Sequence, residues 1–100
     1  MKILNGTDII EIHRIKEDIE TIGNTFLRRV YTQAEIDYCE KKKNQKFESY
    51  AARFAAKEAV YKAISTKTIN LSWQDIEIIN DKTGKPNVNL KRNVEGLDYI

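Results

Sequence analysis

Residues 48 to 64 contain the feature that most restricts how this chain can fold, a regular repeat of alanine. The repeat has spacings of three and four residues, which predicts a helix with a stripe of methyl groups, formed by Ala52, Ala55, Ala56, Ala59 and Ala63. Such a stripe buries little apolar area but lets a second backbone come close. We therefore expect a helix that begins near Glu48 and packs its alanine face tightly against a neighbouring element.

The other side of this helix is rich in charge. It carries Arg53, Lys57, Glu58 and Lys62, with Phe54 and Tyr61 among them. Glu58 and Lys62 are four residues apart with the acid first, a pair worth about 0.2 to 0.5 kcal/mol on an exposed helix. Spacing alone therefore favours a solvated face.

Composition limits the chain to one small domain. It has 100 residues, of which 41% are hydrophobic and 32% charged. It has no apolar run of 18 residues and no signal-peptide pattern, so we expect no membrane span and a cytoplasmic location. The single cysteine, Cys39, excludes an internal disulfide and a cysteine zinc cluster, and is predicted to be a small buried residue.

The net charge of +2 is too balanced to argue for nucleic acid. Basic residues nevertheless gather at Arg28–Arg29 and at Lys41–Lys43 with Lys46. These clusters allow an acidic partner, although charge runs are usually solvated surface.

The N-terminal segment is predicted to be a strand over Lys2–Ile10, because it is apolar and β-branched. Asp8 stands among isoleucines, so we expect it to be at least partly buried, where a carboxylate must be paired or hold a metal. The alternative is that Asp8 caps a helix that begins near Glu11. His13 is the only histidine and is expected on the surface.

Three helical segments follow. Isoleucine spacing predicts an amphipathic helix that ends at Gly23, and Phe26–Val30 is predicted to be a short helix or turn over the core. The Thr32–Glu35 segment has a capping-box pattern, which predicts a helix over Gln33–Lys43 with Cys39 facing inward.

The C-terminal third is predicted to be mainly β. After a loop over 65–70, the segment Trp73–Ile79 alternates as a strand does, and a turn at Asp81–Gly84 leads into a second arm over Pro86–Leu90. A helical turn is expected over 91–95 and a strand entry over 97–100. The whole pattern predicts a single α+β domain over residues 1–100, with helices packed on a small antiparallel sheet.

Three motifs, in order, resemble the small trimeric branch of the 4'-phosphopantetheinyl transferases, the holo-[acyl-carrier-protein] synthases. They are Gly6–Ile15, Arg53–Ala59 with Lys62, and Trp73–Ile78 followed by Gly84–Pro86. The resemblance covers essentially the whole chain. It implies a phosphopantetheinyl transferase-like fold, a homotrimer, and Mg²⁺-dependent transfer of phosphopantetheine from coenzyme A to a serine of apo acyl carrier protein, a step in fatty acid biosynthesis.

The resemblance also implies site residues. Asp8 and Glu58 are expected to hold Mg²⁺, which prefers hard oxygen ligands, and Glu58 is the candidate general base for the serine, directly or through a bound water. Coenzyme A and its leaving group are assigned to Arg53, Lys57, Lys62, Gly84 and Pro86. We place Asp8, Glu58 and Lys62 in the catalytic set. In a trimer, Gly84 and Pro86 are expected to act from the neighbouring subunit.

Acyl carrier proteins are acidic, so docking is assigned to Arg14, Arg28 and Arg29, which would raise the association rate and set orientation. Phe26 is a candidate apolar anchor for the same contact. It is equally a candidate core residue beneath the short helix.

Two departures from the family pattern bear on function. The family has a glycine-rich loop where this chain has Ser65–Thr68, and the family's closing strands with a Ser-x-Ser-His motif do not follow residue 100. We therefore expect a C-terminally incomplete domain that trimerises weakly and has low activity. The alternative is a non-catalytic module that binds acyl carrier protein.

Overall fold

The computed structural model describes residues 6–64 and 71–91. Four α-helices precede a β-hairpin: α1 (Gly6–Ile22), α2 (Asn24–Val30), α3 (Gln33–Glu40), α4 (Lys46–Ile64), β1 (Ile76–Asn80) and β2 (Pro86–Leu90). Short 3₁₀ turns, η1 (Lys43–Gln45) and η2 (Trp73–Asp75), lead into α4 and β1. This arrangement confirms the predicted α+β class, with helices on a small antiparallel sheet.

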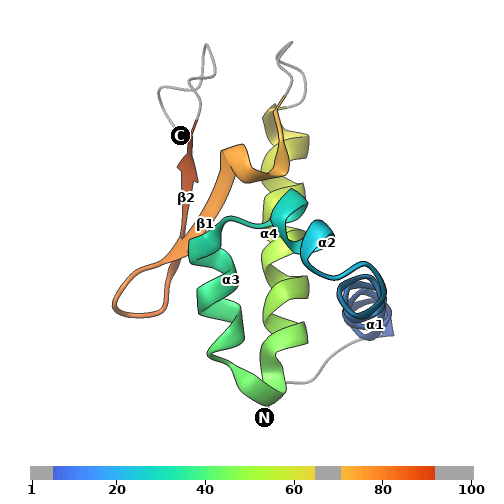
Figure 1. Ribbon diagram of the computed structural model, residues 1–100. Helices are drawn as coiled ribbons and strands as arrows, with labels where there is room; N and C mark the ends of the chain where they lie inside the picture. Colours follow the sequence, from blue (N-terminus) through green and yellow to red (C-terminus); the bar gives the residue numbers. More distant parts are fainter. Residues whose placement is uncertain (1–5, 65–70, 92–100) are drawn as a thin grey trace.

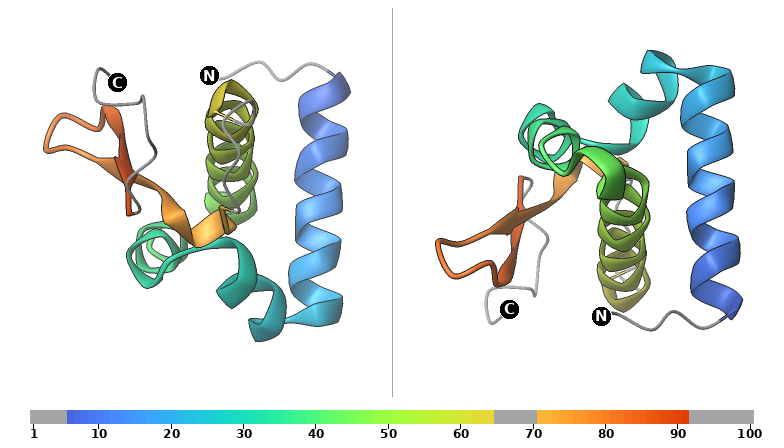
Figure 2. Two further views of the ribbon diagram at one scale, coloured as in Figure 1. Left: turned by 90° about the horizontal axis from the view of Figure 1, so that it is seen from above. Right: turned by 90° about the horizontal axis from the view of Figure 1, so that it is seen from below.

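Helix α4 is the centre of the molecule. It lies between α1 on one side and α3 with the hairpin on the other, and α1 crosses it steeply (Figures 1 and 2). The hairpin pairs Ile76 with Leu90 and Asn80 with Pro86, and its second strand covers the predicted arm over Pro86–Leu90. The face that α4 turns to each neighbour decides which of its side chains are enclosed and which stay exposed.

The first helix corrects one prediction. Residues 6–10 are helical rather than extended, while residues 2–5 of the predicted strand lie outside the described residues. Ile9 precedes Ile12 by three residues and so extends the helical repeat of Ile12, Ile15 and Ile19, whereas Ile10 lies off that repeat and is exposed. Asp8 lies in the first turn, where the helix dipole favours a negative charge. The β propensity of the isoleucines was outweighed by this cooperative helical pattern.

The turns after α1 follow the sequence closely. Gly23 has φ of 76°, which only glycine adopts readily, and separates α1 from α2. The predicted capping box is present at Thr32 and Glu35. Helix α3 ends at Glu40, earlier than predicted, and Lys43 then takes a left-handed φ of 52° that does not continue an α-helix.

Two apolar clusters form the core. The larger packs Ile15 against Val30, Tyr31, Cys39, Tyr50 and Ala51, and joins α1 to α4. The smaller joins Ile64 to Ile76 and Ile78 of the hairpin. Cys39 is fully buried, as predicted. The expected strand over Trp73–Ile79 begins at Ile76, because residues 73–75 form η2, and Glu77 is buried between Ile76 and Ile78.

The alanine face is not the tightly packed face of α4. Ala52, Ala55, Ala59 and Ala63 are exposed and Ala56 is half-buried. Between Ala51 and Ile64, the buried positions of α4 are Arg53 and Lys57, two residues of the face predicted to be solvated. The physical reason is that methyl groups gain little from burial, whereas these two cations find acceptors on α3 and β1.

Candidate functional site

A groove between α1 and α4 contains the first predicted metal ligand. Asp8, Glu11 and Ile12 of α1 line a pocket of about 130 Å³ together with Glu48, Ala51, Ala52 and Ala55 of α4. Asp8 is exposed in this groove, so the expectation that it is at least partly buried is wrong. Its position in the first turn of α1 keeps it at the rim, where it faces the alanines.

Glu58 lies one turn beyond Ala55 on α4, and is half-buried. The pKa of Arg14 in α1 is raised, first by its hydrogen bond and ion pair with Glu11, and further by the charges of Glu58 and Asp18. Glu58 is therefore close enough to α1 to act on its charges. The two predicted metal ligands, fifty positions apart, both belong to the side of the molecule where α1 meets α4.

The donor chemistry of this pair is suited to Mg²⁺. The ion is typically held by one or two carboxylates, with substrate phosphates and waters completing six oxygens. Asp8 and Glu58 would supply two carboxylates, and among the described residues no group of three or more histidine, cysteine, aspartate or glutamate side chains is arranged to hold a metal ion. The residues present thus fit a cation that takes most of its ligands from substrate and water.

The cationic residues of α4 separate into two groups. Lys62, one turn after Glu58, is exposed. Lys57 is fully enclosed, and its ammonium donates to Glu35 Oε1 at 2.6 Å. Burial lowers the pKa of the Lys57 ammonium, and the pairing with Glu35 opposes that effect. This placement revises the phosphate contact predicted for Lys57, since its charged group faces the interior.

Arg53 also points into the fold. Its guanidinium donates to the backbone oxygen of Ile78 and to Asn80 Oδ1, and it lies over the ring of Tyr38 at 4.3 Å from the centroid. Its Nε is buried without a hydrogen-bond partner. Arg53 therefore fastens α4 to β1, and still carries one unsatisfied donor.

A second pocket lies on the hairpin side of α4. It measures about 210 Å³ and is lined by Tyr38, Ser49, Ala52, Arg53, Ala56, Ile78, Asn80 and Pro86. Asn80 also donates to the backbone oxygen of Gly84, which connects the turn to this pocket. The structure thus brings Arg53 and Pro86 together, with Gly84 nearby, but on the opposite side of exposed Ala52 from Asp8.

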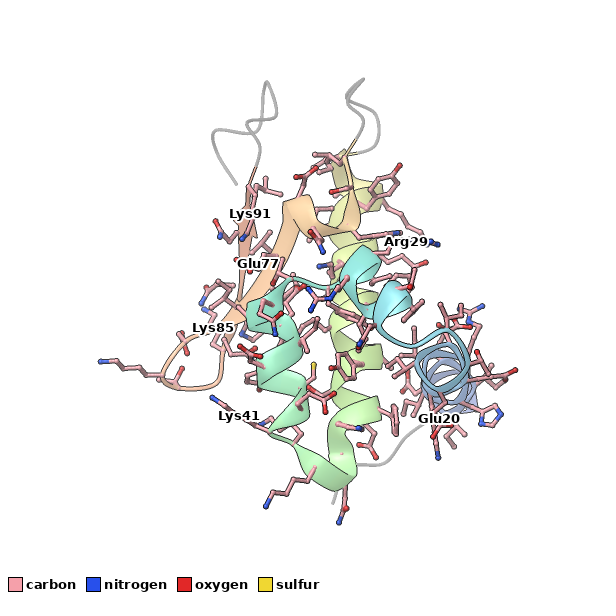
Figure 3. The ribbon with its side chains drawn as sticks, in the orientation of Figure 1. Glu20, Arg29, Lys41, Glu77, Lys85 and Lys91 are labelled. Atoms are coloured by element: carbon pink, nitrogen blue, oxygen red, sulfur yellow. The ribbon has the colours of Figure 1, made fainter. Side chains whose placement is uncertain are left out.

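The predicted docking residues lie on α1 and α2. Arg14, Arg28 and Arg29 are exposed, and Figure 3 shows Arg29 extending away from α2. Phe26 is half-buried and meets Tyr31 edge-on, with ring centroids 6.4 Å apart. Phe26 therefore packs against the core, which was the alternative to a docking anchor.

Glu35 is the residue of this region that the sequence did not reveal. Its Oε1 accepts from Thr32 N at 2.8 Å as well as from Lys57, and its Oε2 accepts from Ile78 N at 2.8 Å. The capping-box pattern assigned Glu35 to the start of α3 and nothing in the sequence linked it to Lys57. One carboxylate therefore joins three elements, α3, α4 and β1.

Glu77 is a second buried carboxylate on the hairpin. It accepts from Asn89 Nδ2 at 3.0 Å and pairs with Lys91 at 3.5 Å (Figure 3). Burial raises the pKa of Glu77, but hydrogen bonds from Thr32 and Asn89 and the charge of Lys91 outweigh it, so the pKa lies below the ordinary 4.5. Glu77 is therefore a stabilising anion of the hairpin.

Comparison with known proteins identifies the family. Residues 5–99 match the model of the 4'-phosphopantetheinyl transferase superfamily. The chain is 54% identical over 91 residues to a holo-[acyl-carrier-protein] synthase of Ruminiclostridium cellulolyticum, covering 90% of this chain and 68% of that protein. It is 52% identical over 93 residues to the synthase of Chloroherpeton thalassium, covering 92% of this chain and 76% of that protein. The synthase of Clostridium tetani is 56% identical over 86 residues, with 86% and 67% covered.

These matches confirm the family resemblance and the expectation that the chain is an enzyme of the transferase class. None of the helices within residues 6–64 and 71–91 has the length and apolar character needed to span a membrane. The chain, with Asp8 in the groove between α1 and α4, therefore belongs to the 4'-phosphopantetheinyl transferase superfamily.

Proposed function

We propose that this protein transfers the 4'-phosphopantetheine group of coenzyme A to a serine of apo acyl carrier protein, and so serves fatty acid biosynthesis in the cytoplasm. The observation that carries the proposal is that Asp8 of α1 lines the same groove as Ala52 and Ala55 of α4. Ala55 lies one helical turn before Glu58. The names of the relatives support the substrates.

Asp8 and Glu58 would hold Mg²⁺, which when bound neutralises charge on the pyrophosphate of coenzyme A. Glu58, three residues after Ala55 of the groove, would also accept the proton of the attacking serine hydroxyl. Lys62 supplies an exposed positive charge one turn further along α4, where it would bind phosphate and favour departure of the bisphosphate. Positioning and positive charge are what phosphoryl chemistry mainly asks of a protein.

The pocket lined by Arg53 and Pro86 would receive the adenosine end of coenzyme A. Because Ala52 separates this pocket from Asp8, we propose that one subunit supplies Asp8, Glu58 and Lys62 while its neighbour in a homotrimer supplies Arg53, Gly84 and Pro86. Exposed Arg14, Arg28 and Arg29 would steer the acidic carrier protein to the groove.

The test is to incubate the protein with apo acyl carrier protein, coenzyme A and Mg²⁺ and to measure the mass of the carrier protein by mass spectrometry. Each of Asp8→Asn and Glu58→Gln is expected to lower the rate about 100-fold, roughly 2.7 kcal/mol of lost transition-state stabilisation, and to raise the Mg²⁺ requirement. Glu20→Gln is the matched control, since Glu20 is exposed on the same helix (Figure 3) and should leave the rate unchanged. Carrier that binds but gains no mass would instead support a non-catalytic module.

A further inference from the structure

Helix α4 buries two cations on the side that it turns to α3 and β1. Its middle three turns, from Ala52 to Ala63, are rich in alanine, and the buried positions among them are Arg53 and Lys57. Methyl groups are worth little on either side of a helix, so within these turns the inward face is marked by Phe54 and Val60, which pack on the core clusters, and by the two buried cations. The two cations are the part of this face that must also meet acceptors when it turns inward, so their partners help to fix the rotation of α4 about its own axis.

That rotation decides the chemistry of the groove. Lys57 and Glu58 are adjacent in the chain, so they lie about 100° apart around the helix. Lys62 follows Glu58 by four residues and shares its face. A rotation of α4 by one residue would bring Lys57 to the position of Glu58 and would turn the carboxylate away from α1.

We propose that Glu35 is a positioning residue for the transferase reaction: by holding Lys57, it fixes the rotation of α4 so that Glu58 and Lys62 face α1. Its two oxygens receive hydrogen bonds from three elements, at 2.6 to 2.8 Å. The side chains of Glu35 and Lys57 are both 0% exposed. A buried ion pair of this kind contributes little net stability but allows only one arrangement that satisfies both charges.

Arg53, one helical turn before Lys57, supports the same rotation of α4. It lies four residues before Lys57, on the same face of α4, and binds β1 at Ile78 and Asn80. Ile78 thereby donates its N–H to Glu35 and accepts from Arg53 through its carbonyl. The backbone of Ile78 and the carboxylate of Glu35 are hydrogen-bonded to each other, and together they bind Arg53 and Lys57 of α4.

The inference rests on the proposed function, and the experiment separates the two. Glu35→Gln, Lys57→Met and the double variant are compared with the unchanged protein for kcat, for KM of coenzyme A, and for affinity of Mn²⁺ measured directly by electron paramagnetic resonance. Glu40→Gln with Lys46→Met is the matched control, because this pair also joins α3 to the start of α4, at 3.5 Å, but is partly exposed.

Positioning predicts that each single variant lowers kcat and Mn²⁺ affinity by about 10- to 100-fold, and that the double variant loses no more than either single one, since the pair acts as a unit. KM for coenzyme A should change by less than about threefold. The control pair should change neither kcat nor Mn²⁺ affinity.

Three results would overturn the inference. A double variant that regains thermal stability together with kcat and Mn²⁺ affinity would show a role in folding alone. Loss confined to Lys57→Met, with a raised KM for coenzyme A, would show a phosphate contact of Lys57. Unchanged Mn²⁺ affinity in folded Glu35→Gln would also contradict it.

If a single variant fails to fold, Glu35→Asp retains the charge but cannot span all three donors, and it should give the same loss of Mn²⁺ affinity. Should the unchanged protein transfer no phosphopantetheine, the proposed function fails. The Mn²⁺ measurements and the hydrogen-exchange protection of the Ile78 amide then still decide the role of Glu35.

Discussion

Replacing Arg53 with methionine should destabilise the protein by about 2 to 3 kcal/mol. The side chain donates from a buried guanidinium to the Ile78 carbonyl and to Asn80 Oδ1, and lies 4.3 Å from the centre of the Tyr38 ring. Two hydrogen bonds from a charged group contribute about 1.5 kcal/mol or more each, and the ring contact about 1 kcal/mol. Methionine offsets roughly 1 to 2 kcal/mol of this lost stability, because its side chain is apolar and the unsatisfied Nε is removed.

The assay is urea unfolding followed by circular dichroism, with thermal unfolding alongside. For a chain of this size, 2 to 3 kcal/mol corresponds to a drop in Tm of about 10 to 20 °C. Arg53→Lys should cost about as much, because one ammonium cannot reproduce the fork that reaches both acceptors. The urea m value should stay the same, since the surface exposed on unfolding changes little.

A double-mutant cycle with Asn80→Ala checks the cause. The contact at Asn80 predicts a coupling energy of about 1 kcal/mol, so the double variant should be less destabilised than the sum of the two single ones. Additive effects, or a cost below about 0.5 kcal/mol for Arg53→Met, would refute the view that Arg53 fastens α4 to β1.

Three further predictions follow from buried or constrained groups. Because the pKa of Glu77 is lowered in the folded protein, the unfolded chain takes up the proton first as the pH falls. The free energy of unfolding should therefore decrease below about pH 4.5, and should decrease less steeply in Glu77→Gln. Urea unfolding between about pH 3 and pH 7 measures both. Tyr31→Phe should cost about 0.5 to 1.5 kcal/mol in thermal unfolding, because the hydroxyl donates to the buried carbonyl of Tyr50 at 2.8 Å, and an unchanged Tm would contradict this. Gly84→Ala should cost about 1 to 2 kcal/mol, since φ is 88° there, whereas Gly6→Ala, at a helix start, should be neutral or stabilising.

Much of the fold could be predicted because its signals are local. The capping box at Thr32 and Glu35, the break at Gly23 and the hairpin around Gly84 each depend on residues a few positions apart. The strand prediction was wrong for residues 6–10, because it too relied on local preference. Isoleucine favours strands when taken alone, and the helical repeat that begins at Ile9 becomes decisive only over the length of α1.

The candidate site could be predicted in part. The motifs located Asp8 and Glu58, and the fold places both where α1 meets α4. Neither the exposure of Asp8 nor the separation of the Arg53 pocket from it follows from spacing, since both depend on how α1 and the hairpin pack on α4. Phe26 similarly could be a surface anchor or a core residue until Tyr31 was placed against it.

The sequence by itself determined the helical faces of α4: it set Arg53 and Lys57 on one side and Glu58 with Lys62 on another. Only the tertiary structure decided which side is interior, and it buried the two cations rather than the alanines. The physical reason is that a cation can be buried only where hydrogen-bond acceptors are present. Here the acceptors come from remote segments, Glu35 of α3 and Ile78 of β1. A helix pattern carries no information about those acceptors.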